Sequence, residues 1–231
     1  MLSKEYLENG ICVLQDDELY KFTSDAILLS NFVVVKKGDV VADFCAGSGI
    51  VGLNTYAKHK DKIKSVTFFE MQKEFCALIE NSLKENGLEQ NFNAVCVKVQ
   101  DIGKEYFGKF SLITCNPPYF KTGSGFGKEN PKLKMAREEV YLPLEDLIFK
   151  ISKCLKFGGR VCMVHLADRL VDVLYLMRKY NLEPKRLQFY SAKDKAPYLF
   201  TVEATLGGKS GLKITPSVVN QAFGGKKTEA E

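Results

Sequence analysis

Histidine is scarce in this sequence, and its scarcity excludes several kinds of site. Only two histidines occur, His59 and His165, and neither has a cysteine or a second histidine nearby at the spacing of metal ligands. A zinc site or a histidine-based triad is therefore not expected. His59 lies in the charged run KHKDKIK, which is typical of a solvated connector, and His165 closes an apolar run, which indicates a strand-end residue rather than a catalyst.

Paired cysteines and long apolar runs are also missing. The seven cysteines occur singly, with no C-x-x-C pair and no signal peptide ahead of them, so we expect reduced thiols in a cytoplasmic protein. No apolar run approaches the ~20 residues that a helix needs to cross a bilayer, so no membrane partner is expected.

Neither sign of charge dominates the composition. The formal net charge of +5 and the pI near 8.7 are compatible with a polyanionic partner but do not require one. With 231 residues, of which 45% are hydrophobic and 26% charged, the chain can bury the core of one domain, or of one domain with a small appendage.

Short apolar runs alternate with longer amphipathic ones from Gly38 onward, which predicts βαβ units around a parallel sheet. Helices are predicted over 72–87 and over 143–159, the second with Pro143 at its start and Gly158 at its end. The last two strands are joined by the short segment SAKDKAPY, so they should pair antiparallel near one edge of the sheet. The predicted strands span 39–46, 63–70, 93–101, 110–116, 159–166, 185–192 and 199–206.

A separate unit is expected ahead of this alternation, over residues 1–37. GICVLQ (10–15) and ELYKF (18–22) suggest a small hairpin, and SDAILLSNFVVV (24–35) suggests a helix with Ser24 or Asp25 near its cap. The main domain then spans 38–216, and residues 217–231, which end in GGKKTEAE, are expected to form a flexible tail.

The stretch DFCAGSGIVG, 43–52, links the first predicted strand of the alternation to a helix. Gly47, Gly49 and Gly52 satisfy G-x-G-x-x-G, a loop that lets the backbone approach a ligand closely at a helix N-terminus. Taken alone, this loop equally suits the pyrophosphate of NAD. Glu70, which ends the next predicted strand, is placed to accept the hydroxyls of an adenosine ribose, and this fits NAD and S-adenosylmethionine equally.

Two further acids narrow the choice of cofactor. Asp43 lies at the entrance of the glycine loop, where its charge opposes a pyrophosphate but suits the ammonium or sulfonium region of a cationic cofactor. The alternative role for Asp43 is a local cap of the loop. Asp101 is placed to accept the adenine amino group, with Ile102 packing on the ring, although a simple turn residue explains Asp101 nearly as well.

The run FSLITC is followed by Asn-Pro-Pro-Tyr, residues 116–119. Two prolines cannot extend a central strand, so the strand ends at or just past Asn116. The chain therefore carries, in this order, a D-x-x-x-G-x-G loop, acids at two strand ends and Asn-Pro-Pro-Tyr at a third. With these motifs it resembles the S-adenosylmethionine-dependent methyltransferases that act on a planar amino group. The resemblance implies a Rossmann-like α/β fold of the class I type, with a mostly parallel seven-stranded sheet that includes one antiparallel strand.

The chemistry of an exocyclic amino group explains the Asn-Pro-Pro-Tyr motif. The nitrogen shares its lone pair with the ring, so it must be oriented rather than deprotonated. The Asn116 side-chain oxygen and the Pro117 carbonyl can each accept one of its hydrogens, and Tyr119 can stack on the base. The alternative is a purely structural turn. Residues 120–139, rich in glycine and lysine, suit a lid that orders on a phosphate backbone, or else a solvated insertion.

The segments flanking these motifs narrow the resemblance. ELYKFTSDAILLSNF, NPPYFKTGSG, MAREEVYLPLEDLI and SAKDKAPYLFTVEATLGGKSGLKITP are similar to the bacterial family that methylates adenine in valine tRNA beside the anticodon. The family pattern has a histidine after Arg137, whereas this chain has Glu138. The resemblance implies S-adenosylmethionine as the cofactor and tRNA or another structured RNA as the partner. It implies catalytic roles for Asn116, Pro117, Pro118 and Tyr119, substrate contacts from Tyr119, Phe120, Lys121 and Arg137, and cofactor contacts from Phe22, Asp25, Asp43, Ala46, Gly47, Gly49, Glu70, Met71, Asp101, Ile102 and Asn116.

Three alternative functions remain open on the sequence alone. A methyltransferase acting on an rRNA base or a protein glutamine amide uses the same motif, but glutamine-modifying relatives usually carry a larger N-terminal helical domain than the roughly 38 residues here. A nicotinamide-dependent oxidoreductase would explain the glycine loop. A non-catalytic RNA-binding module is disfavoured by the intact Asn116.

Overall fold

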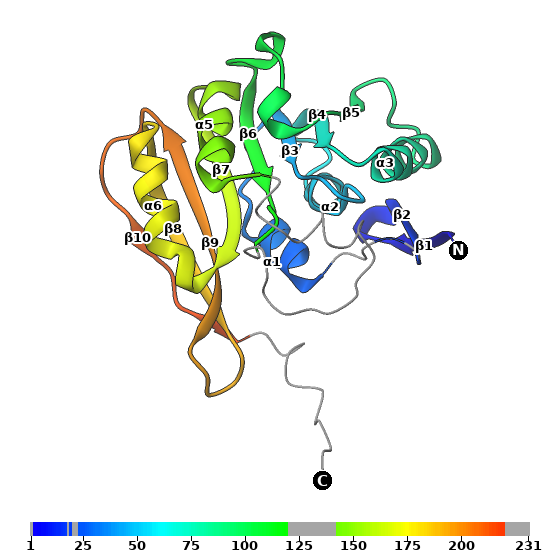
Figure 1. Ribbon diagram of the computed structural model, residues 1–231. Coiled ribbons are helices and arrows are strands. Elements are labelled where there is room, and N and C mark those ends of the chain that lie inside the picture. Colours follow the sequence, from blue (N-terminus) through cyan, green and yellow to red (C-terminus); the bar gives the residue numbers. More distant parts are fainter. Residues whose placement is uncertain (1, 18, 20–22, 120–141, 220–231) are drawn as a thin grey trace.

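A central β-sheet organises the computed structural model, which describes residues 2–17, 19, 23–119 and 142–219 (Figure 1). Within these residues the sheet has nine strands. Their order is β10 (Lys213–Ile214), β8 (Leu182–Ser191), β9 (Pro197–Leu206), β7 (Leu155–Leu166), β6 (Phe110–Cys115), β3 (Asp39–Phe44), β4 (Ile63–Glu70) and β5 (Phe92–Cys96), with β11 (Val218–Val219) also paired to β8.

The sheet is mostly parallel, as the alternation of apolar and amphipathic runs predicts. Neighbours from β7 to β5 all pair parallel, and β9 pairs antiparallel with both β7 and β8. The predicted Rossmann-like fold is confirmed. The two-residue strands β10 and β11 extend it beyond the seven predicted strands, because the chain after β9 turns back and runs parallel to β8.

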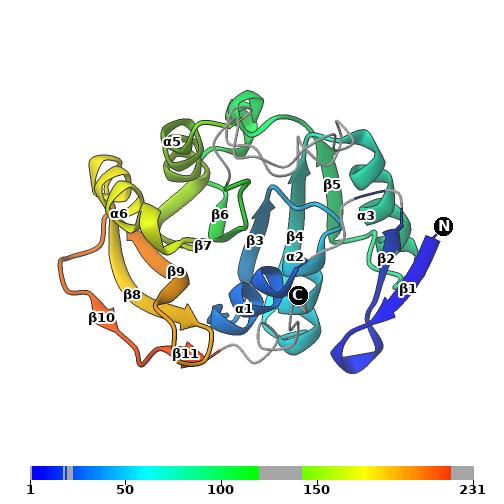
Figure 2. The ribbon, with the colours of Figure 1, turned by 60° about the horizontal axis from the view of Figure 1, so that its bottom comes forward.

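Helices cover both faces of the sheet, as Figure 2 shows for α5 and α6 on one side and α1 and α2 on the other. Apolar residues of α1, α2 and α3 share one buried cluster with the sheet, and those of α5 and α6 share a second. No helix of the described residues is long and apolar enough to span a membrane. The helices are α1 (Ser24–Phe32), α2 (Ile50–Lys58), α3 (Lys73–Glu85), α5 (Leu144–Cys154) and α6 (Leu170–Lys179).

The N-terminal hairpin differs from the predicted one. β2 (Cys12–Asp16) pairs with β1 (Leu2–Tyr6), not with residues 18–22, of which only Leu19 lies among the described residues. Helix α1 has Thr23 as its N-cap, so Ser24 and Asp25 lie near the cap as predicted, and the helix ends at Phe32 because Val33 is already extended. The hairpin packs on α3, where Asn86 exchanges hydrogen bonds with the backbone of Cys12 at 2.8 and 2.7 Å.

Three other boundaries differ from prediction. The helix over 143–159 ends at Cys154, and residues 155–159 begin β7 instead. Gly159 lies so close to the backbone there that a Cβ would be 2.8 Å from the Lys156 carbonyl oxygen, which requires glycine. β5 ends at Cys96, and residues 99–101 form a 3-10 turn. Residues 218–219 of the expected tail form β11.

Candidate active site

The glycine loop joins β3 to α2 through a chain of left-handed residues. Cys45, Gly47 and Gly49 have φ of 58°, 53° and 80°, and Gly49 is the N-cap of α2. At Gly47 no protein atom lies within 4 Å of where a Cβ would stand, so the missing side chain leaves space beside the backbone. Gly52 serves packing instead, because a Cβ there would lie 2.5 Å from Cε1 of the buried Phe68.

Glu70 fastens this loop to the end of β4. Its Oε2 accepts the Gly47 N–H at 2.9 Å, and its Oε1 accepts the N–H groups of Met71 and Gln72 at 2.8 and 2.9 Å. Only 7% of Glu70 is exposed, and burial raises the pKa of its carboxyl despite these three donors. A carboxylate has about four acceptor positions, so roughly one remains open, on Oε2.

The structure places Asp43 behind the glycine loop. It is 1% exposed and does not line the cavity described below. Its Oδ2 accepts the Gly52 N–H at 2.9 Å and its Oδ1 accepts the Thr114 hydroxyl at 2.7 Å, so it joins β3, β6 and α2 from inside. Burial raises the pKa of Asp43 to about 7. These contacts match the local cap given above as the alternative.

Asn-Pro-Pro-Tyr leaves the end of β6 at the same edge of the sheet. β6 ends at Cys115, so Asn116 follows directly, half-buried. The Tyr119 hydroxyl donates a hydrogen bond to Asn116 Oδ1. The Tyr119 ring lies 5.2 Å from the imidazole of His165, near the end of the neighbouring strand β7.

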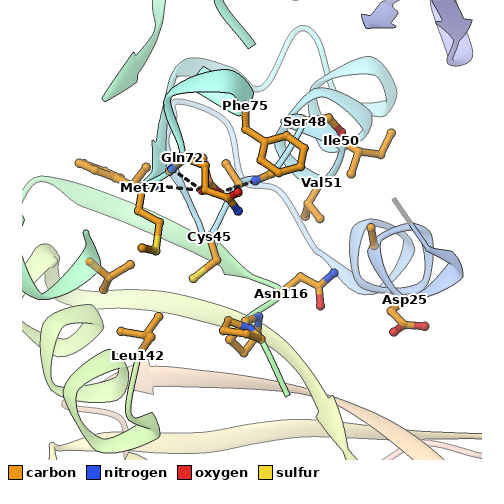
Figure 3. A pocket seen from close by; sticks show the side chains of 18 of the residues that line it. Asp25, Cys45, Ser48, Ile50, Val51, Met71, Gln72, Phe75, Asn116 and Leu142 are labelled. Atoms are coloured by element: carbon orange, nitrogen blue, oxygen red, sulfur yellow. Dashed lines mark hydrogen bonds between the residues drawn. The ribbon is translucent and has the colours of Figure 1, made fainter. Parts of the chain in front are cut away.

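One cavity, of about 1080 Å³ including its open mouth, collects these elements. Figure 3 shows Glu70's neighbours Met71 and Gln72 with Phe75 on one side, and Asn116 and Asp25 on the other. Of the predicted residues, those that line the cavity are Asp25, Ala46, Gly47, Glu70, Met71, Asn116, Pro117, Pro118 and Tyr119.

Apart from Asp43, the remaining predicted residues fall into three groups. Gly49 lies outside the lining and packs on Ile79 and Phe68. Asp101 is exposed and Ile102 is buried in the core, neither of them in the lining, because the chain turns after β5 and presents Val97, Val99 and Gln100 to the cavity instead. The structure does not describe Phe22, Phe120, Lys121 and Arg137, so their expected roles stay predictions. Glu138 also lies outside the described residues.

Sequence reasoning missed several residues of the lining. Gln72 and Phe75 follow Glu70 into the first turn of α3, and their place after a strand end was an available signal. Cys45 and Ser48 are inside the glycine motif itself. Thr23 and Leu142 reach the cavity from distant parts of the chain, and no local pattern predicts that.

Comparison with known proteins places the fold and the motifs in one family. The sequence model of the methyltransferase small domain matches residues 22–177. The chain belongs to this family. A tRNA1(Val) (adenine(37)-N6)-methyltransferase from Shewanella putrefaciens is 24% identical over 176 residues, which cover 75% of this chain and 72% of the relative.

Two solved structures of similar fold are described as methyltransferases. A predicted O-methyltransferase from Agrobacterium tumefaciens superposes with a TM-score of 0.66 at 18% identity, covering 84% of this chain and 86% of the other. The tRNA m1G37 methyltransferase of M. jannaschii superposes with a TM-score of 0.62 at 18% identity, covering 90% of this chain and 55% of the other. These likenesses confirm the fold.

The protein is an S-adenosylmethionine-dependent methyltransferase, and the cavity fits this cofactor. Gly47 leaves room beside the loop, the open acceptor of Glu70 suits a hydroxyl, and apolar side chains such as Phe75 and Val99 suit a flat ring. The family match does not support the nicotinamide alternative.

Proposed function

We propose that the protein transfers a methyl group from S-adenosylmethionine to the exocyclic N6 of an adenine in tRNA, and specifically in valine tRNA next to the anticodon. The observation that carries the proposal is the placement of Asn116 and Tyr119 in the same cavity as the glycine loop and Glu70. The Shewanella relative, named for this reaction, and the net charge of +5 support the substrate class.

The target nitrogen needs orientation more than it needs a base. Asn116 Oδ1 and the Pro117 carbonyl accept its two hydrogens and turn its lone pair toward the methyl donor. When bound, S-adenosylmethionine supplies a methyl group on a positively charged sulfur. Asn116 Oδ1 and the Pro117 carbonyl would hold the two hydrogens of N6 while the methyl group is accepted, and the hydrogen that N6 loses would leave as a proton.

The residues that line the cavity support a set of proposed cofactor contacts. Glu70 takes one ribose hydroxyl on its open Oε2 position, and a second hydroxyl requires one backbone N–H to give way. Phe75, Val97 and Val99 enclose the adenine ring of the cofactor. Asp25, half-buried in the first turn of α1, faces the cavity where a cationic amine is favoured, although burial raises the pKa of its carboxyl.

We also propose that different parts of the chain bind the cofactor and the RNA. The N-terminal unit, 1–37, closes over the cofactor through α1, since Thr23, Asp25 and Ala26 line the cavity. Residues 38–216 carry the transfer site. Tyr119 and residues 120–139 bind the RNA in this proposal.

The test uses valine tRNA transcribed in vitro, recombinant protein and S-adenosylmethionine, with nucleosides analysed by mass spectrometry after digestion. We expect one N6-methyladenosine per tRNA, placed beside the anticodon by fragment mapping, and none with an RNA whose target adenine is replaced by purine, which lacks the amino group. Methylation of the purine-substituted RNA at another base, or of protein glutamine instead, would refute the proposed substrate.

A further inference from the structure

His165 is almost completely enclosed, at 1% exposure, beside the proposed base site. Its ring meets Tyr119, with 5.2 Å between ring centroids and 59° between planes. It also lies nearly parallel to Phe200, its register partner on β9, at 6.4 Å and 27°. The three rings therefore contact one another in series, from Phe200 in the sheet through His165 to Tyr119.

A backbone hydrogen bond fixes the orientation of the imidazole within this series of rings. His165 Nδ1 accepts the N–H of Leu166 at 2.9 Å, so Nδ1 carries no proton and the ring cannot turn over without losing a buried hydrogen bond. The imidazole thus presents one fixed face to Tyr119. The sequence indicated only a strand-end residue here.

Tyr119 passes this constraint to the acceptor amide. Its hydroxyl donates to Asn116 Oδ1, which sets which way the carboxamide faces. An amide oxygen can accept two hydrogen bonds, so Oδ1 can still receive one hydrogen of the target amino group. Phe200, His165, Tyr119 and Asn116 form one continuous set of contacts that ends at the reacting group.

We propose that His165 is a positioning residue for methyl transfer, acting through its ring on Tyr119 and through Tyr119 on Asn116. The proposal rests on the proposed function, in which Asn116 orients the amino group. His165 touches neither the base nor the methyl donor in this scheme. Its effect is on the rate of transfer once both are bound, because misplacement of an acceptor by about 1 Å can lower a rate roughly 100-fold.

Three substitutions separate the ring from the backbone hydrogen bond. His165→Phe keeps a planar ring between Tyr119 and Phe200 but loses the acceptor for Leu166, whereas His165→Asn keeps an acceptor and loses the ring. His165→Ala loses both. Met163→Ala, two residues earlier on β7 and equally buried, removes a side chain of the core cluster that also contains Phe200 but takes no part in the ring contacts, and it serves as the control for lost packing.

The readout is kcat and KM for tRNA, with the dissociation constant for S-adenosylmethionine measured by calorimetry on each variant. We expect His165→Asn and His165→Ala to lower kcat at least about tenfold with cofactor affinity unchanged, and His165→Phe to keep most of the wild-type kcat. If His165→Asn keeps full kcat and His165→Phe does not, His165 only caps the strand end and the proposal fails. It fails equally if Met163→Ala lowers kcat as much as His165→Ala.

A measurement without RNA separates this inference from the proposed function. The protein is labelled with 3-fluorotyrosine, and the Tyr119 signal among its ten tyrosines is assigned with Tyr119→Phe. His165→Ala should shift and broaden that fluorine signal, and His165→Phe should leave it sharp. An unchanged Tyr119 signal in His165→Ala would overturn the positioning role even if the wild type methylates another substrate.

Discussion

Replacing Asp43 by asparagine should remove the loss of folding stability that the buried carboxyl causes as the pH rises. Asparagine has the same shape, and its Oδ1 can accept the Gly52 N–H while its amide nitrogen donates to the Thr114 hydroxyl, which then acts as acceptor. The two buried contacts of Asp43 therefore survive, and only the ionisable group is lost.

The magnitude follows from the pKa of Asp43, which burial raises from 3.8 to about 7. Well below pH 3.8 the carboxyl is neutral in both the folded and the unfolded state. Between pH 4 and 7 the unfolded chain releases the proton while the folded protein keeps it, so wild-type stability falls as pH rises. At about 1.4 kcal/mol per pKa unit, the full penalty above pH 7 is about 4 kcal/mol, of which roughly 2–3 kcal/mol develops between pH 5 and 8.

Urea unfolding of both proteins at pH 5 and pH 8 measures this difference. The stability of Asp43→Asn minus that of wild type should grow by about 2–3 kcal/mol from pH 5 to pH 8. Asp61→Asn, which removes an exposed carboxylate from the α2–β4 connection, should show no such growth. An equal difference at both pH values would mean that Asp43 is ionised in the folded protein throughout, and the account of its burial would be wrong.

Two other predictions concern the same loop. Gly52→Ala should lower the free energy of unfolding by about 1–3 kcal/mol in urea, because the new Cβ meets the enclosed Phe68 ring, whereas Gly103→Ala, which meets only the flexible end of Glu105, should change it by less than about 0.5 kcal/mol. Glu70→Gln turns an N–H₂ toward Gly47 N–H and should weaken S-adenosylmethionine binding about 10- to 100-fold by calorimetry. Cofactor affinity as strong as that of the exposed control Glu80→Gln would remove Glu70 from the cofactor site.

The central strands were predictable because their apolar runs carry the signal themselves. β4, Ile63–Glu70, has the predicted bounds, and β6 ends one residue before its predicted end, where the prolines require it. β1 was missed because its residues, LSKEY, are mostly polar and mostly exposed, so no apolar pattern marks it. β10 and β11 have two residues each, too few for any period to appear.

The site was predictable where one motif sits on one strand end, and not where distant segments meet. Asn116, Glu70 and Gly47 reach the cavity directly from the ends of β6, β4 and β3. Asp101 was wrongly predicted at the end of a strand, because residues of high β-propensity continue in the sequence past Cys96, where β5 ends. The contact of His165 with Tyr119 depends on β7 lying beside β6, and sequence spacing does not encode that neighbour.

The orientation of the target amino group by Asn116 is the central claim, and a single-turnover methylation assay tests it most directly. Excess enzyme saturated with radiolabelled S-adenosylmethionine is mixed with valine tRNA, and wild type is compared with Asn116→Ala, with cofactor affinity measured in parallel. The account predicts that the variant transfers the methyl group at least about 100-fold more slowly than wild type, with a cofactor dissociation constant within about threefold of the wild-type value. A variant that transfers the methyl group at the wild-type rate would contradict it.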